Sequence, residues 1–304
     1  MTPCIACLQG CVANMYAGNP VCCLTNPFLG HEAEPLEKAE EPKKVMVIGG
    51  GVAGLSAAFI AKERGHEVTL YEAGDVLGGN MRLAAYPPGK GDITNMIRSY
   101  IHRCQKDGVK IVMNCEVTPE LIKEEKPDSV IIATGSKTLI LPIEGIDNPA
   151  IIHGSDLLDG KRAAGKKVLV VGGGMVGCET AAFLGEQEND VTVIEFRDTV
   201  GADVIHEHRV YLMKDFEDYG IKEITGAKVC KFYEDGVEYE TADGVRHESR
   251  GYDSVILSMG FRNYNPLEEK IKDLVPETHV IGDAIRARRA LDATKEAYEV
   301  ASRI

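Results

Sequence analysis

The sequence predicts an α/β protein with two similar parallel-sheet units behind a short cysteine-rich segment. Residues 43–72 and 166–195 align without a gap, and 13 of their 30 positions are identical. Each copy reads as a buried strand, a glycine turn, a helix and a second strand that ends in Glu. The apolar stretches 128–135 (DSVIIATG) and 253–260 (DSVILSMG) follow the copies and are expected to add a strand to each sheet. These units predict two Rossmann-like dinucleotide-binding domains.

The end of the chain predicts that the second domain is inserted into the first. Residues 279–283 (HVIGD) read as a strand entering a turn, and this strand is expected to complete the first sheet. Residues 32–44 are charged, contain two prolines and lack apolar periodicity, so they read as a linker. The expected parts are a cysteine segment with linker at 1–42, the first domain at 43–138 and 260–304, and the inserted second domain at 139–259.

Composition and charge argue against nucleic acid and membranes as partners. The 304 residues carry a formal net charge of −13. No run of Lys or Arg is longer than two, so the chain shows no footprint for a polyanion. The apolar stretch 45–61 contains four glycines and reads as strand, turn and helix rather than as a membrane span. Residues 1–37 lack the Lys or Arg that starts a secretory signal, so a cytoplasmic location is expected.

The first copy carries a dinucleotide-binding pattern. Gly49, Gly51 and Gly54 form G-x-G-x-x-G between the strand and the helix, and Glu72 ends the next strand. The glycines permit a tight turn and let a pyrophosphate approach the helix N-terminus, while the acidic side chain suits a ribose. An ordinary glycine turn is the alternative. The residues expected to bind this dinucleotide are Gly49, Gly51, Val52, Ala53, Gly54 and Glu72.

The second copy repeats the pattern with the same spacing, which predicts a second dinucleotide site. The acid Glu195 at the end of its second strand repels a 2′-phosphate and favours NADH over NADPH. Arg197, two residues further on, could accommodate that phosphate and keeps NADPH open. The residues expected at this NAD(P)-binding site are Gly172, Gly174, Met175, Val176, Gly177, Glu195 and Gly260.

Five of the nine cysteines lie within the first 23 residues. Cys4, Cys7, Cys11 and Cys23 have the spacing C-x2-C-x3-C-x11-C, in which three thiolates wrap a cluster and a fourth returns from a loop. Iron-sulfur clusters are held by such sets of four thiolates. A structural zinc site usually has two C-x2-C pairs, and zinc or inert thiols are the alternatives. Cys22 is an ambiguous fifth thiol.

Taken together, the chain resembles the C-terminal two thirds of the group formed by 2,4-dienoyl-CoA reductase, clostridial enoate reductase and trimethylamine dehydrogenase. The segments CIACLQGC at 4–11 and CLTNP at 23–27 resemble the cluster motif of the reductases. This resemblance implies a 4Fe-4S cluster with Cys23, rather than Cys22, as its fourth ligand.

The resemblance also implies FAD at the first glycine motif and NAD(P)H at the second. LGGN at 77–80, the ATG step and HVIGD resemble further FAD contacts of the family, with Asp283 at the ribityl chain. The helix near Asp292, its expected N-cap, would direct its N-terminus at the flavin ring. The FAD-binding residues that the resemblance adds are Gly79, Asn80, Arg82, Thr134, Gly135, Gly282, Asp283 and Ala293.

The enzymes of this group begin with a TIM barrel that carries FMN and the substrate site, whereas this sequence begins at the cysteine segment. The resemblance therefore implies a separate FMN-containing TIM-barrel partner, or an excised fragment. The implied activity passes electrons from NAD(P)H through FAD and 4Fe-4S to an ene-reductase that reduces activated C=C bonds. Because the cofactors carry this chemistry, no catalytic acid or base is expected.

Three other functions stay open. A free-standing NAD(P)H diaphorase could feed ferredoxin or another acceptor, although the cysteine spacing argues against the known types. A thioredoxin-reductase-like enzyme needs a redox-active cysteine pair near the flavin, and the sequence offers none. A non-redox scaffold could hold plain ADP at the first motif, although a scaffold has no use for the intact second motif.

Overall fold

The first repeat forms the middle of a five-stranded parallel sheet in the computed structural model, which describes residues 2–304. The strand order is β15-β4-β1-β2-β3. The strands are β1 (Lys44–Ile48), β2 (Glu67–Tyr71), β3 (Lys110–Val112), β4 (Ser129–Ile132) and β15 (Glu277–Val280). Because β15 pairs with β4, with Val280 opposite Ile132, the last strand of the chain shares a sheet with the first repeat.

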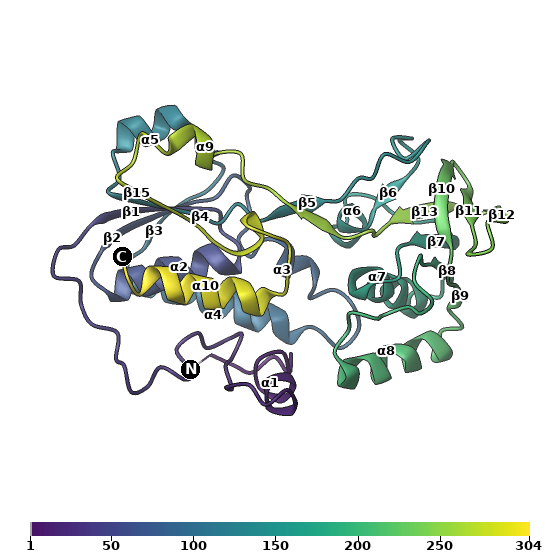
Figure 1. Cartoon of the computed structure of the whole chain (residues 1–304), viewed down its shortest axis with the longest axis horizontal. Helices are drawn as coiled ribbons and strands as arrows, with labels where there is room; N and C mark the ends of the chain where they lie inside the picture. Colours follow the sequence, from purple (N-terminus) through teal and green to yellow (C-terminus); the bar gives the residue numbers. More distant parts are fainter. Residues whose placement is uncertain (1) are drawn as a thin grey trace. The chain divides into compact units, whose positions relative to one another are not determined.

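Helices cover both faces of this sheet (Figure 1). The helices on one face are α2 (Val52–Glu63), α4 (Asp92–Asp107) and α10 (Ala290–Ala301), and those on the other are α5 (Pro119–Glu125) and α9 (Glu268–Ile271). Alternate residues of β1 face opposite ways, so Val45 and Val47 pack with the first group while Met46 and Ile48 pack with the second. Residues 52–61 of α2 are all buried, as expected for a helix that is apolar all round.

The cysteine segment is anchored on α4. Leu24 is fully buried in the same core as α2 and α4, and its carbonyl oxygen accepts the Tyr100 hydroxyl at 2.9 Å. This contact holds the return of the segment, just after Cys23, against the sheet domain. The other short elements of this part are α1 (Val12–Tyr16), α3 (Asn80–Leu83) and the 3-10 turn η1 (Gly282–Ala284).

The second repeat forms another five-stranded parallel sheet, in the order β6-β13-β7-β8-β9. Its strands are β6 (Ile152–His153), β7 (Lys167–Val171), β8 (Asp190–Ile194), β9 (Lys222–Ile224) and β13 (Ser254–Leu257). With α7 (Met175–Glu186) between β7 and β8, every bound of this β-α-β unit is shifted by 123 from that of β1, α2 and β2. The repeat seen in the sequence is therefore a repeat of structure.

The second sheet is covered differently on its two faces. Val168 and Val170 of β7 pack with α7 and α8 (His206–Asp218). Leu169 and Val171 instead pack with Phe232, from a three-stranded antiparallel sheet. The remaining elements are the strands of that sheet, β10 (Lys228–Tyr233), β11 (Gly236–Glu240) and β12 (Arg246–Arg250), and helix α6 (Gly154–Leu158).

Contacts divide the chain into two compact units. Unit 1 comprises the residues up to Ala85 together with Gly91–Lys137 and Arg262–Ile304, and unit 2 comprises Tyr86–Lys90 and Thr138–Phe261. The chain leaves and re-enters unit 1 near the paired strands β5 (Ser136–Thr138) and β14 (Phe261–Asn263). The predicted α/β fold with two parallel sheets is confirmed. No helix between residues 2 and 304 is long and apolar enough to cross a membrane.

Candidate functional site

The first glycine motif forms a tight turn with open space over the start of α2. A Cβ on Gly49, whose φ is +107°, would lie 2.3 Å from the Ala133 carbonyl oxygen, and one on Gly54 would lie 1.9 Å from the Gly49 oxygen. Gly51 differs, because its nearest neighbour within residues 2–304 would be Gly79 Cα at 4.0 Å. Two glycines are thus required by packing, and the third leaves a cradle at the helix N-terminus that fits a pyrophosphate.

Glu72 closes this turn from the carboxyl end of β2. Its Oε2 accepts the Gly50 backbone N–H at 2.7 Å, and its Oε1 accepts that of Gly74, also at 2.7 Å. Two charge-assisted bonds hold the carboxylate at the carboxyl edge of the sheet, where dinucleotides bind in this fold. The position suits a carboxylate that receives ribose hydroxyls.

A hydrogen-bond chain joins two further residues predicted to bind FAD. Asn80 Nδ2 donates to Ser136 Oγ at 3.2 Å, and that hydroxyl donates to Asp283 Oδ2 at 2.9 Å. The other carboxylate oxygen of Asp283 accepts the Arg288 backbone N–H at 3.0 Å. Sequence reasoning missed Ser136, although it directly follows Gly135 in the ATGS run.

Thr134 and Gly135 are held by the chain that returns after β14. The Thr134 hydroxyl donates to the Tyr264 carbonyl oxygen, and the Tyr264 N–H donates to the Gly135 oxygen at 2.9 Å. Gly135 has a φ of +74°, and apart from its chain neighbours no atom of residues 2–304 lies within 4 Å of a Cβ built there. Arg82 lies in α3 with its backbone N–H bonded to Gly79 O at 3.1 Å.

Gly282 brings the starts of α2 and α10 together. A Cβ on this residue, whose φ is +63°, would lie 3.1 Å from Ala53 Cβ and 3.2 Å from Ala293 Cβ. Ala53 and Ala293 are both buried in the protein. The expectation that Asp292 is the N-cap of α10 is wrong. The helix begins at Ala290, and Asp292 accepts the backbone N–H of the cap residue Arg289 at 3.2 Å.

The second glycine motif repeats the geometry of the first. A Cβ on Gly172 would lie 2.4 Å from Ser258 O, and one on Gly177 would lie 1.8 Å from Gly172 O. Glu195 is buried, and its Oε2 accepts the Gly173 N–H at 2.5 Å while its Oε1 accepts the Arg197 N–H at 3.0 Å.

Val176 and Gly260, which are also predicted at the second site, take part in hydrogen bonds through their backbone carbonyl oxygens. Val176 O accepts the Thr180 hydroxyl at 2.8 Å within α7. Gly260 has a φ of +95°, and its carbonyl oxygen accepts the Leu139 N–H at 2.9 Å. A side chain at Gly260 would be strained by this backbone conformation, which explains the glycine.

The two motifs differ at the helix N-terminus. Asp203 Oδ1 accepts the Met175 N–H at 2.9 Å, and both of its carboxylate oxygens would lie 3.5 Å from a Cβ on Gly174. The sequence analysis missed Asp203, which lies in a loop 28 residues after Met175. No sequence signal distinguishes it from an ordinary solvated loop acid.

Helix α7 also carries the buried acid Glu179, which forms an ion pair with Lys90 from another part of the chain. Lys90 Nζ contacts Glu179 Oε1, and Glu179 is only 8% exposed. Burial raises the pKa of Glu179, and the charge of Lys90 opposes this rise. Sequence reasoning missed the pair because its members lie 89 positions apart.

The backbone of the cysteine segment directs N–H groups at sulfur. Ala6 and Leu8 have φ values of +51° and +55°, and the Ala6 N–H donates to Cys4 Sγ at 3.3 Å. A backbone N–H of Gln9 likewise bonds the Cys7 sulfur. Alternating backbone of this kind forms concave anion sites that occur at iron-sulfur centres, so the segment fits a thiolate-bound cluster.

The pKa of Cys7 is set by burial and by its neighbours. Burial raises it most, the backbone of Gln9 lowers it, and the charges of Cys23, Cys11 and Cys4 raise it further. The Cys22 sulfur accepts Asn14 Nδ2 at 3.4 Å. Within residues 2–304, no three His, Cys, Asp or Glu side chains lie close enough to hold one metal ion, so the cluster stays a prediction.

Two other cysteines are unsuited to redox chemistry. Burial raises the pKa of both Cys104 and Cys178 to about 12, so each stays a thiol at neutral pH. Their sulfurs donate to the carbonyl oxygens of Leu55 at 3.4 Å and Gly173 at 3.2 Å. These cysteines act as packing residues.

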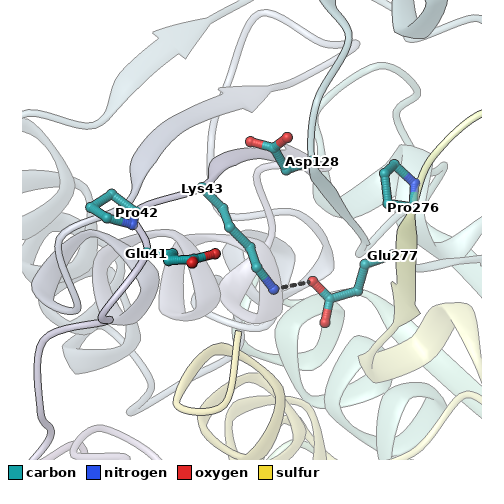
Figure 2. Close-up of a pocket in the computed structure, with 6 residues that line it drawn as sticks. All are labelled: Glu41, Pro42, Lys43, Asp128, Pro276 and Glu277. Atoms are coloured by element: carbon teal, nitrogen blue, oxygen red, sulfur yellow. Dashed lines mark hydrogen bonds and ion pairs between the residues drawn. The ribbon is translucent and has the colours of Figure 1, made fainter.

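A surface pocket lies at the opposite edge of the first sheet (Figure 2). Its lining residues are Glu41, Pro42, Lys43, Asp128, Pro276 and Glu277. Lys43 Nζ contacts Glu277 Oε2 at 2.8 Å across it. The pocket meets the amino ends of β1, β4 and β15, whereas doubly wound sheets bind ligands at the carboxyl ends of their strands. It is therefore not part of the candidate sites.

The chain has two parallel sheets, and each carries a glycine turn and an acid at the end of the next strand. This arrangement is typical of oxidoreductases that bind two dinucleotides. The chain belongs to the pyridine nucleotide-disulphide oxidoreductase family, whose model matches residues 43–281. This membership supports FAD and NAD(P)H as cofactors and makes the chain an NAD(P)H-dependent flavoprotein oxidoreductase module.

The chain is similar to several reductases within this family. The chain is 34% identical to cinnamate reductase of Clostridium sporogenes, covering 99% of this chain and 45% of the relative. It is 33% identical to a metal reductase of Desulforamulus reducens, covering 98% and 50%. A solved 2-naphthoyl-CoA reductase complex superposes with a TM-score of 0.94 at 33% identity, covering 99% and 46%. The chain thus spans about half the length of these relatives and matches the C-terminal FAD/NADH part of the enoate reductase family, which confirms the resemblance.

Proposed function

We propose that the chain takes a hydride from NADH onto FAD and passes the two electrons singly through a 4Fe-4S cluster to a partner. The observation that carries this proposal is that both glycine motifs form the same turn, in a chain whose first 23 residues contain four cysteines spaced C-x2-C-x3-C-x11-C. A hydride donor cannot feed a one-electron acceptor directly, so a flavin is required between them. The chemistry belongs to the cofactors, and the protein binds and tunes them.

FAD is assigned to the first motif. The cradle at Gly51 would hold the pyrophosphate, and Glu72 would hold the adenosine ribose. Beyond the pyrophosphate, the chain Asn80, Ser136 and Asp283 offers hydroxyl and carboxylate groups for the ribityl hydroxyls. The N-terminus of α10 would stabilise negative charge on the reduced flavin.

NADH is assigned to the second motif. Glu195 is buried and tied to two backbone N–H groups, so its charge stays where a 2′-phosphate would have to lie. Arg197 is exposed, and its backbone N–H donates to Glu195. The guanidinium of Arg197 is the feature of this site that favours NADPH. We expect NADH to be preferred.

The cluster is assigned to Cys4, Cys7, Cys11 and Cys23, and it would carry electrons onward one at a time. The acceptor is a domain or subunit with an FMN-bearing TIM barrel that reduces activated C=C bonds. The names of the relatives support this class, since cinnamate has a C=C bond conjugated with its carboxylate. Nine unpaired cysteines suit a reducing compartment, so the cytoplasm is the proposed location.

Anaerobic spectra of the purified protein test the proposal. Flavin bands with a broad iron-sulfur shoulder are expected, and NADH should bleach the flavin and then the shoulder. Bleaching of the flavin alone would contradict the electron route and leave the diaphorase. A colourless protein that binds ADP would support the non-redox scaffold instead.

A further inference from the structure

The two repeats end their first strands in the same turn, but only one helix N-terminus is covered. At α2, leaving aside Gly51 and its two chain neighbours, Gly79 Cα at 4.0 Å is the nearest atom of residues 2–304 to a Cβ built on Gly51. At α7, the carboxylate of Asp203 lies 3.5 Å from the equivalent point on Gly174 and accepts the Met175 N–H at 2.9 Å. A carboxylate thus stands at the second helix where the glycine motif would place a pyrophosphate.

Asp203 is presented by a pinned turn. The Gly201 N–H donates to the Gly173 carbonyl oxygen at 2.7 Å, and the Val204 N–H donates to Gly201 O at 3.1 Å. The Arg209 guanidinium holds the Val200 carbonyl oxygen from behind, at 3.1 Å. The backbone of the loop is therefore fixed to the glycine motif, and the Asp203 side chain is exposed at its tip.

The surroundings of Asp203 carry charges of both signs. Burial raises the pKa of Glu179 most, the charges of Lys90 and His208 lower it, and the charge of Asp203 raises it. A dinucleotide would add two phosphate charges to this place. The helix N-terminus favours one anion there, so the carboxylate and the pyrophosphate exclude each other.

We propose that Asp203 is an internal competitor for the pyrophosphate of the nucleotide at α7. NAD(P)H binds only when the carboxylate swings away, and the carboxylate returns as the oxidised nucleotide leaves. Together with the open cradle at Gly51, this contact makes the second site an exchange site and the first a resident site. The inference rests on the proposed function, because it requires a dinucleotide at the second motif.

Binding of ADP-ribose to the FAD-loaded full chain tests this by calorimetry, since ADP-ribose carries both phosphates but has no nicotinamide that could pass a hydride to FAD. Asp203→Asn and Asp203→Ala should each bind it about tenfold more tightly than the native chain. Asp243→Asn is the matched control, because Asp243 accepts hydrogen bonds from Thr241 and Val245 within its own turn. The affinity of this variant for ADP-ribose should not change.

The outcomes separate the two proposals. An Asp203 variant that retains its FAD and binds ADP-ribose no more tightly than the native chain overturns the competitor. If neither the native chain nor any variant binds ADP-ribose or NADH, the assignment of the second motif is wrong and the competitor goes with it. Asp203→Asn keeps an oxygen for the Met175 N–H, so it covers the case in which the Ala variant does not fold.

Discussion

The Glu195 carboxylate accepts the Gly173 backbone N–H at 2.5 Å, inside the glycine turn of the second repeat. The same bond joins Glu72 to Gly50 at 2.7 Å in the first repeat. In each copy, the acid at the end of the second strand therefore orders the phosphate-binding turn as well as offering its other lone pairs to a ribose. The acid and the glycines form one unit, so substitutions in them are coupled.

Replacing Glu195 by Gln should shift the preference from NADH toward NADPH. Gln keeps an acceptor for the Gly173 N–H but removes the charge that repels a 2′-phosphate. We expect the ratio of kcat/KM for the two nucleotides, measured with ferricyanide, to fall about tenfold, equivalent to about 1.4 kcal/mol. The matched variant Glu72→Gln should lower FAD content and leave the ratio unchanged. A native chain that prefers NADPH would overturn the assignment.

Two neighbouring cysteines offer an internal control for the cluster. Cys23→Ser should lose most of the bound iron, because Cys23 is the predicted fourth ligand of the cluster. Cys22→Ser should retain about four irons per chain, because the proposed ligand set does not include Cys22, whose sulfur accepts Asn14 Nδ2. Iron and zinc analysis of both proteins measures this. Full iron in Cys23→Ser, or zinc in the native chain, contradicts the ligand set.

Substituting two glycines of the first motif should have different effects, one on stability and the other on FAD binding. Gly54→Ala puts a Cβ 1.9 Å from the Gly49 oxygen, so it should destabilise the fold by at least about 1–3 kcal/mol through overpacking. Gly51→Ala meets only Gly79 Cα at 4.0 Å and should fold normally while losing FAD. Urea unfolding and flavin content distinguish the two. Full flavin retention in Gly51→Ala would show that the cradle is not the FAD site.

Replacing Lys90 alone should lower the free energy of unfolding more than replacing Lys90 and Glu179 together. Lys90→Met leaves a buried carboxylate without its cation, and we expect a loss of about 3 kcal/mol in the free energy of unfolding at pH 7. Adding Glu179→Gln removes that charge, so the double variant should recover part of the loss. A double-mutant cycle by denaturant unfolding measures the coupling between the two residues. If the losses of the two single variants add up to that of the double variant, the residues are not coupled.

His66 should make stability fall in acid. It is fully buried, and its Nδ1 accepts the Lys43 N–H at 3.0 Å, which requires a neutral ring. Burial lowers its pKa, and Arg64 and Lys43 lower it further, against a smaller opposite effect of Glu277. The folded pKa thus lies below the unfolded value, so this contribution is complete above about pH 6.5 and is lost as the pH falls below it.

His66→Asn, which can still accept the Lys43 N–H, isolates this contribution. Between pH 6.5 and 5 the native chain should lose up to about 1.4 kcal/mol per pH unit more than the variant. Denaturant unfolding at several pH values measures the difference. Parallel pH profiles for the two proteins would exclude His66 as the cause.

The sequence by itself determined the two β-α-β repeats, down to bounds shifted by 123, and the residues of both glycine turns. These features are local, because each turn is dictated by glycines and apolar strands within about thirty residues. It could not reveal Ser136 against Asp283, Lys90 against Glu179, or Asp203 over the start of α7. Each of these contacts joins segments whose approach depends on the packing of sheets and loops. A solvated acid and a capping acid have the same local sequence, so only the tertiary structure decided which helix N-terminus is covered.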